Sequence, residues 1–245
     1  MHERDAVSPQ RADDGGASLR GEAKARLVQR MFNQIVPRYD LMNRLMTGGM
    51  DRRWRQVAAR MAEPAGKRIL DIATGTGDLA IDLTKAGAHV IAADFASQML
   101  LAAKRKVSGD TSLVLADAEH LPFLPASFDR VTNAFLLRNL SDLDQGLREM
   151  RRVLRPHGAL ISLEITRPAP GPFAALFGLY FYRLVPRLGG MIAGEPEAYR
   201  YLPNSLTIFP MVQELADRMR AAGFSDVTYR TFGLGTVALH IARVP

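Results

Sequence analysis

A pair of glycines and four aspartates are the first candidates for chemistry in this sequence. Gly75 and Gly77 lie in the stretch DIATGTGDLA, which follows an apolar run. In this pattern the backbone approaches a ligand closely, and a helix N-terminus that favours phosphate follows. The aspartates are Asp71, Asp78, Asp94 and Asp117. The glycines alone would fit a dinucleotide, so the acidic residues must decide which ligand the loop takes.

The acidic residues favour a positively charged nucleoside over a dinucleotide. Asp71, Asp78 and Asp117 are all expected at the C-terminal edge of a parallel sheet, where ligands bind in this architecture. Carboxylates there would repel a diphosphate and attract the ammonium and sulfonium groups of S-adenosylmethionine. Asp94, at the end of the second predicted strand, can bind ribose hydroxyls, and the region of Asp117 and Ala118 can receive adenine. Capping of the following helix is the alternative role for Asp71 and Asp78.

The elements that must position these residues alternate along the chain. Strands are expected at 68–73, 89–93, 112–116, 129–134 and 159–164, with helices up to residue 85, at 97–107 and at 141–154. This alternation predicts an α/β fold with a mostly parallel sheet and helices on both faces. A helix at 211–222 should end at Gly223. The last two apolar runs, 227–232 and 236–242, have no helix between them and should pair antiparallel.

The N-terminal part of the chain is predicted to be helical. Residues 1–20 are polar and aperiodic, which is typical of a disordered tail, and 21–245 should form one domain. Apolar spacing predicts a helix at 24–35 that Pro37 should end. A second helix at 41–62 is interrupted at Thr47-Gly48-Gly49, and Trp54 is expected in the core. Residues 24–64 would form a helical lid, and 168–201 a long insertion.

Composition narrows the class of protein. The chain has 245 residues, of which 47% are hydrophobic and 23% charged, as in ordinary soluble domains. It has no cysteine and five scattered histidines, so no metal site is predicted. No apolar run is long enough to span a membrane, and no signal peptide is evident, which predicts a cytoplasmic protein. The net charge of +7 is spread along the chain without an aromatic-rich basic motif, so no nucleic-acid partner is expected.

Several segments of the chain resemble the ubiquinone/menaquinone biosynthesis C-methyltransferase family, one of the class I S-adenosylmethionine-dependent methyltransferases. The likeness runs from about residue 27 to 242. The segments that carry it are YDLMNRLMTGGMDRRW, LPFLPASFD, FLLRNLSDLDQGLREM, RVLRPHGALISLEIT, YRYLPNSL and VALH. The departures are Thr47, Asp51, His157 and Thr166, where the family usually has Ser, His, Gly and Ser.

The resemblance implies a fold, a reaction and a set of contacts. The fold would be Rossmann-like, with a mostly parallel seven-stranded sheet and an antiparallel C-terminal strand. The reaction would move a methyl group from S-adenosylmethionine to a ring carbon of a polyprenylated quinol, in the menaquinone pathway, the ubiquinone pathway or both. Taken with the glycine loop, the expected cofactor-binding residues are Asp71, Gly75, Thr76, Gly77, Asp94, Asp117 and Ala118.

Catalytic candidates follow the fourth predicted strand. A ring carbon becomes a good nucleophile once a neighbouring phenol loses its proton. Arg138 could stabilise that phenolate by a charge-assisted hydrogen bond, although a guanidinium stays charged in proteins and is therefore a poor base. Asn139 could orient the ring, whereas a structural ion pair with Asp142 or Asp144 is the alternative for Arg138. The proton acceptors considered are water, Tyr39, Asp40 and His240.

The insertion and the rival functions leave alternatives open. The segment 173–190 places apolar residues beside Arg183 and Arg187, which fits peripheral contact with the inner face of the cytoplasmic membrane. A buried helix or a homodimer contact explains the same segment equally well. The rival functions are an O- or N-methyltransferase on the same fold, a nicotinamide dehydrogenase and a non-catalytic binding protein.

Overall fold

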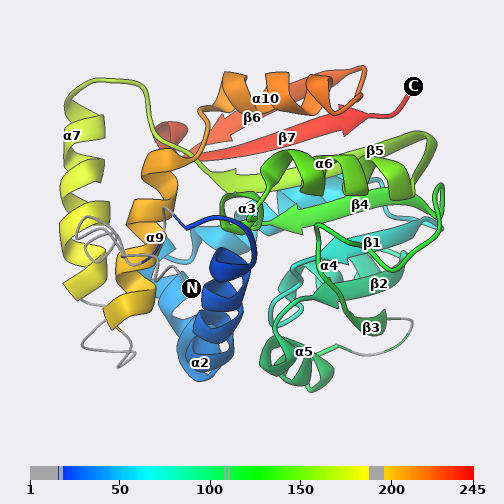
Figure 1. The fold of residues 1–245 in the computed structure, drawn as a ribbon, viewed down its shortest axis with the longest axis horizontal. Helices are drawn as coiled ribbons and strands as arrows, with labels where there is room; N and C mark the ends of the chain where they lie inside the picture. Colours follow the sequence, from blue (N-terminus) through cyan, green and yellow to red (C-terminus); the bar gives the residue numbers. More distant parts are fainter. Residues whose placement is uncertain (1–15, 17–18, 108, 110, 188–195) are drawn as a thin grey trace, which may run out of the picture.

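A mixed sheet of seven strands, in the order β3-β2-β1-β4-β5-β7-β6, runs through the centre of the protein (Figure 1). The computed structural model describes residues 16, 19–107, 109, 111–187 and 196–245, so the predicted tail lies almost wholly outside the described residues. The strands are β1 Arg68–Ile72, β2 His89–Asp94, β3 Thr111–Leu115, β4 Phe128–Ala134, β5 Leu154–Ile165, β6 Val227–Phe232 and β7 Val237–Arg243. β7 runs antiparallel to both of its neighbours, β5 and β6, and the other pairs are parallel, which confirms the predicted fold class.

Helices pack on both faces of the sheet and beyond the C-terminal ends of its parallel strands (Figure 1). They are α2 Gly21–Thr47, α3 Met50–Met61, α4 Asp78–Lys85, α5 Ser97–Lys104, α6 Leu143–Val153, α7 Pro172–Leu179, α9 Pro196–Ile208 and α10 Val212–Ala221. Alternate residues of the strands point to opposite faces. Leu70 and Val131 therefore join the core beneath α6 and α10, whereas Ile69 and Ile161 join the core beneath α3 and α4.

The expected end of the first helix at Pro37 is wrong, because α2 continues through it to Thr47. A proline inside a helix costs about 3 kcal/mol. The apolar face of α2 offsets this cost, since Ile35 and Met42, on either side of the proline, are both buried in one cluster with Met99 of α5. The helix ends at Gly48, which has a left-handed φ of 58°, as the predicted interruption requires.

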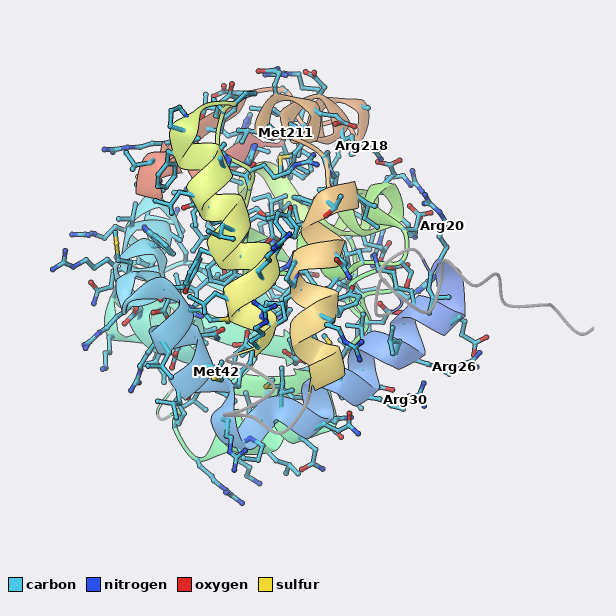
Figure 2. The ribbon with its side chains drawn as sticks, turned by 90° about the vertical axis from the view of Figure 1, so that its left-hand side faces the viewer. Arg20, Arg26, Arg30, Met42, Met211 and Arg218 are labelled. Carbon is cyan, nitrogen blue, oxygen red and sulfur yellow. The ribbon has the colours of Figure 1, made fainter. Side chains whose placement is uncertain are left out.

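Three helices stand beyond the C-terminal ends of the parallel strands. Figure 1 shows α2, α7 and α9 on this side of the sheet, and Figure 2 views them from the front, with α7 and α9 side by side. A π-helical turn, η2 (Tyr180–Leu184), extends α7. The predicted insertion is therefore largely helical, although its residues 188–195 lie outside the described part. Within that part, no helix combines the length and apolar character needed to cross a bilayer.

Candidate active site

Three adjoining hollows lie at the C-terminal ends of β1, β2 and β4. The first, the strand-edge cavity, has about 720 Å³ of space between the strand ends and α2. Tyr39, Asp94, Asp117, Ala118 and Asn139 all line it, so the fold brings together five of the predicted site residues. The second and third hollows are the apolar cavity and the glycine-loop pocket. Tyr39 lines all three.

Asp94 is the last residue of β2 and fastens the glycine loop. Its carboxylate accepts backbone N–H groups from Gly75 and Ala96, both at 2.8 Å, and the residue is only 8% exposed. Burial raises the pKa of Asp94 to about 6, although these hydrogen bonds oppose the shift. A carboxylate oxygen has more than one lone pair, so the group can still accept a hydroxyl from a ligand in the cavity.

Asp71 and Asp78 line the glycine-loop pocket, together with Thr74, Thr76 and Arg55. Asp71 accepts hydroxyl groups from Thr74 at 2.7 Å and Thr132 at 2.8 Å, and burial raises its pKa to about 6. Asp78 begins α4 and pairs with Lys106 at 2.5 Å. Neither side chain caps α4, whose N-cap is Gly77, so the alternative capping role is not observed.

The glycine loop is closed by a polar cluster from three elements. Thr76 Oγ1 donates to Asp40 Oδ1 at 2.7 Å, and Lys106 Nζ donates to Asp40 Oδ2 at 2.9 Å. Burial opposes ionisation of Asp40, but these two partners outweigh it and lower its pKa. Gly77 has a φ of 88°, and a Cβ there would stand 2.9 Å from Val107, so this position requires glycine. Asp40 thus ties α2 to the loop and does not line the apolar cavity.

Asp117 and Ala118 lie just beyond β3, which ends at Leu115, one residue before the expected strand end at 116. Asp117 accepts the backbone N–H of Glu119 at 2.9 Å and faces His120 Nδ1 at 3.3 Å. Its side chain is 39% exposed, whereas Ala118 is buried. This turn therefore forms one wall of the strand-edge cavity while leaving the Asp117 carboxylate accessible.

The apolar cavity has about 890 Å³ of space and opens between α2, α3, α7 and η2. Its walls are mainly aromatic and aliphatic, and they include Phe32, Ile35, Trp54, Phe177, Tyr180 and Phe181. Trp54 is buried in the core as predicted and also borders this cavity. Of the described residues that line the cavity, only Asp51 and Arg138 carry a charge.

Arg138 lies in a 3₁₀ turn, η1 (Leu137–Asn139), and forms a buried ion pair with Glu164. The predicted partners were wrong: Asp142 caps α6 through the N–H of Gln145, and Asp144 pairs with Arg218 at 3.0 Å. Glu164 is brought to Arg138 because β5 runs parallel to β4, so both strands end at the same edge. This pairing depends on tertiary structure, which local sequence distance does not reveal.

The other catalytic candidates lie in different surroundings. Asn139 lines the strand-edge cavity and donates to the carbonyl of Phe135 at 3.1 Å, while its buried Oδ1 has no hydrogen-bond partner. Burial raises the pKa of Tyr39, so its hydroxyl stays protonated. His240 lies in β7 and bonds to the carbonyl of Val212 at 3.0 Å, away from all three hollows. His240 is therefore not positioned to accept a proton from a substrate in these hollows.

Sequence reasoning missed several residues of the site. Phe135 follows β4 with a left-handed φ of 66°, and it borders both large cavities. Such backbone strain in a residue other than glycine is typical of functional sites. Asp51 and Arg55 form a buried ion pair at 2.5 Å, and Arg55 also lies 5.5 Å from the ring centroid of Phe135. The i,i+4 spacing of Asp51 and Arg55 on α3 was the available signal.

The fold and the site together define a class I S-adenosylmethionine-dependent methyltransferase architecture. A solved S-adenosylmethionine-dependent methyltransferase from Thermotoga maritima, described as a possible histamine N-methyltransferase, aligns with a TM-score of 0.63 at 18% identity, over 88% of this chain and 99% of that one. The [4+2]-cyclase SpnF aligns with a TM-score of 0.67 at 18% identity, over 90% and 96%. At these identities the likeness concerns the fold and leaves the reaction open.

Sequence comparison gives the family. The chain belongs to the ubiE/COQ5 methyltransferase family, which matches residues 20–243. A demethylmenaquinone methyltransferase of Thermus thermophilus is 48% identical over 221 residues, 88% of this chain and 100% of the relative. A ubiquinone/menaquinone biosynthesis C-methyltransferase of Desulfotalea psychrophila is 42% identical, over 87% of this chain and 88% of the relative. The family expected from the sequence motifs is thereby confirmed.

Proposed function

We propose that this protein transfers a methyl group from S-adenosylmethionine to a ring carbon of a polyprenylated quinol. The observation that carries the proposal is the meeting of two cavities at Tyr39 and Phe135. One cavity is edged by carboxylates, and the other is apolar with a single guanidinium. The names of the relatives in Thermus thermophilus and Desulfotalea psychrophila support a quinone-pathway substrate.

The residues of the strand-edge cavity fit the donor. Asp94 would accept ribose hydroxyls, and Asp117 with Ala118 would border the adenine. In the glycine-loop pocket, Asp71 would attract the ammonium group. Asp51 and Asp78 both contact Arg55 through Nη1. The other guanidinium nitrogens of Arg55 would bind the carboxylate of the donor's amino-acid moiety. The donor supplies an electrophilic methyl group on a sulfonium.

The apolar cavity fits the acceptor. Its aromatic walls can enclose a quinol ring and the first part of a prenyl tail. The Arg138 guanidinium would stabilise the phenolate form of the ring, and its pairing with Glu164 holds it in place. Holding the ring carbon beside the methyl group can contribute roughly 7–11 kcal/mol to the rate. Such a reaction needs positioning and charge stabilisation more than a reactive side chain.

The outer face of α7 and η2 is proposed to rest on a bilayer. No residue of α7 is buried, and Leu176, Leu179 and Leu184 are 63%, 57% and 46% exposed. The exposed side chains of Arg183 and Arg187 lie on the same segment and suit anionic lipid. The inner side of this segment borders the apolar cavity through Phe177 and Tyr180, so a prenyl tail would pass directly from the lipid into the site.

Three measurements test these proposals. Calorimetry should show binding of S-adenosylhomocysteine and none of NAD, and mass spectrometry should show one methyl group added to a ring carbon of a short-chain demethylmenaquinol. Methylation of oxygen, or tight binding of NAD alone, would overturn the proposed reaction. In flotation with anionic vesicles, Leu176→Ser/Leu179→Ser should stay unbound while the unmodified protein floats. If the unmodified protein stays unbound as well, the bilayer proposal fails.

A further inference from the structure

The apolar cavity contains one carboxylate, Asp51, which lies in the first turn of α3 and is 4% exposed. Its Oδ1 lies 2.9 Å from Thr47 Oγ1, and its Oδ2 lies 2.5 Å from Arg55 Nη1. These two contacts fix the carboxylate in place. Each oxygen retains acceptor capacity, so a proton donor in the cavity can still reach the group.

A proton acceptor is needed in this cavity because methylation of a ring carbon releases a proton. The inference rests on the proposed function. The ring carbon forms a bond to the methyl group while the sulfur–carbon bond breaks and its electron pair stays on sulfur. The ring carbon then carries both hydrogen and methyl. Loss of that hydrogen as a proton returns the electron pair to the ring and restores its aromaticity.

The other groups near the cavity are poorly suited to take this proton. Tyr39 stays protonated because burial raises its pKa. Arg138 is permanently charged and already bonds to Glu164, and Glu164 itself does not line the cavity. Asp40 is held by Thr76 and Lys106 at the glycine loop, on the other side of Tyr39.

We infer that Asp51 is the catalytic base that removes the ring proton after methyl transfer. The proton moves from the methylated ring carbon to an Asp51 oxygen and leaves for solvent before the next turnover. The intermediate is far more acidic than a phenol because losing the proton restores the aromatic ring, so a carboxylate is strong enough. General base catalysis of this kind is worth about 10²–10⁴-fold in rate.

An isotope effect separates this role from a structural one. The probe is a short-chain demethylmenaquinol that carries deuterium on the ring carbon that receives the methyl group. Asp51→Asn should lower turnover by about 10²–10⁴-fold and show a primary isotope effect larger than that of the unmodified enzyme, because proton removal becomes limiting. S-adenosylhomocysteine should still bind. The matched control is Asp78→Asn. Asp78 also faces Arg55, but it does not line the apolar cavity. Whatever the turnover of this variant, its isotope effect should equal that of the unmodified enzyme.

A second variant keeps the test decisive if Asp51→Asn fails to fold. Asp51→His restores a proton acceptor, so its turnover at a saturating donor concentration should rise with pH through about 6.5, the usual pKa of histidine, and a flat pH profile would overturn the inference. Near-normal turnover of Asp51→Asn, or a slow variant with an unchanged isotope effect, would overturn the inference. Absence of methyl transfer by the unmodified enzyme would instead count against the proposed function.

Discussion

Arg138 and Glu164 form a buried ion pair between the turn after β4 and the end of β5. Arg138 is 6% exposed and Glu164 only 1%. Truncating one member of such a pair leaves a buried charge without its partner and costs about 3–5 kcal/mol, whereas replacing both can be nearly neutral. The pair therefore couples the stability of the fold to the group proposed to stabilise the phenolate.

Arg138→Met should lower the free energy of unfolding by about 3–5 kcal/mol and abolish turnover. The double variant Arg138→Met/Glu164→Leu should recover most of the stability and none of the turnover. Denaturant unfolding and a methyl-transfer assay on the same samples measure both. Recovery of turnover in the double variant would show that Arg138 has only a structural role.

Binding of S-adenosylhomocysteine should strengthen as pH rises from 5 to 7. Burial raises the pKa values of Asp71 and Asp94 to about 6. In the free protein, the protonated forms of these two carboxyls contribute to the free energy of unfolding. This contribution is fully present below their ordinary pKa of about 3.9 and is lost as pH rises through about 6. A ligand that needs one ionised carboxylate should bind about tenfold more tightly at pH 7 than at pH 5.

Calorimetry at several pH values checks this dependence. Asp94→Asn should weaken binding at pH 7 and reduce its pH dependence, because the amide does not titrate whereas Asp71 still does. If the affinity of the unmodified protein is the same at pH 5 and 7, ionisation of these carboxyls does not contribute to binding.

Lys24 fastens α2 to the turn that carries Arg138. Its buried Nζ donates to the carbonyls of Leu140 at 2.6 Å and Arg138 at 3.2 Å, and burial lowers its pKa to about 8. Lys24→Met leaves both carbonyls without this donor, so it should cost about 1–3 kcal/mol of stability and weaken nucleoside binding. Arg26→Met, at an exposed ion pair with Glu22, is the control and should change stability by less than about 1 kcal/mol.

His157→Gly should stabilise the protein. His157 is exposed near the start of β5 and has a left-handed φ of 60°. The ubiE/COQ5 family usually has glycine at this position. Relief of this conformation is worth about 1–2 kcal/mol, and the extra freedom of glycine in the unfolded chain costs about 0.5–1. A net gain of about 0.5–1 kcal/mol should raise Tm by about 1–3 °C in calorimetry. His157→Ala keeps the strained backbone and should give no such gain.

The sequence by itself determined the fold class, the glycine loop and the cofactor edge. Strand alternation and the two C-terminal runs follow from local hydrophobic periodicity, which a single sequence displays directly. Asp94, Asp117 and Asn139 end up around one cavity because parallel strands bring their C-terminal ends to one edge.

Tertiary structure alone decided the partners of the charged residues and the path of α2. Pro37 was expected to end the helix, but burial of Ile35 and Met42 against other elements outweighs the local cost. Glu164, not Asp142 or Asp144, pairs with Arg138, because two strands distant in sequence end side by side. Burial and ion pairing depend on which segments meet in space, and local periodicity does not encode those meetings.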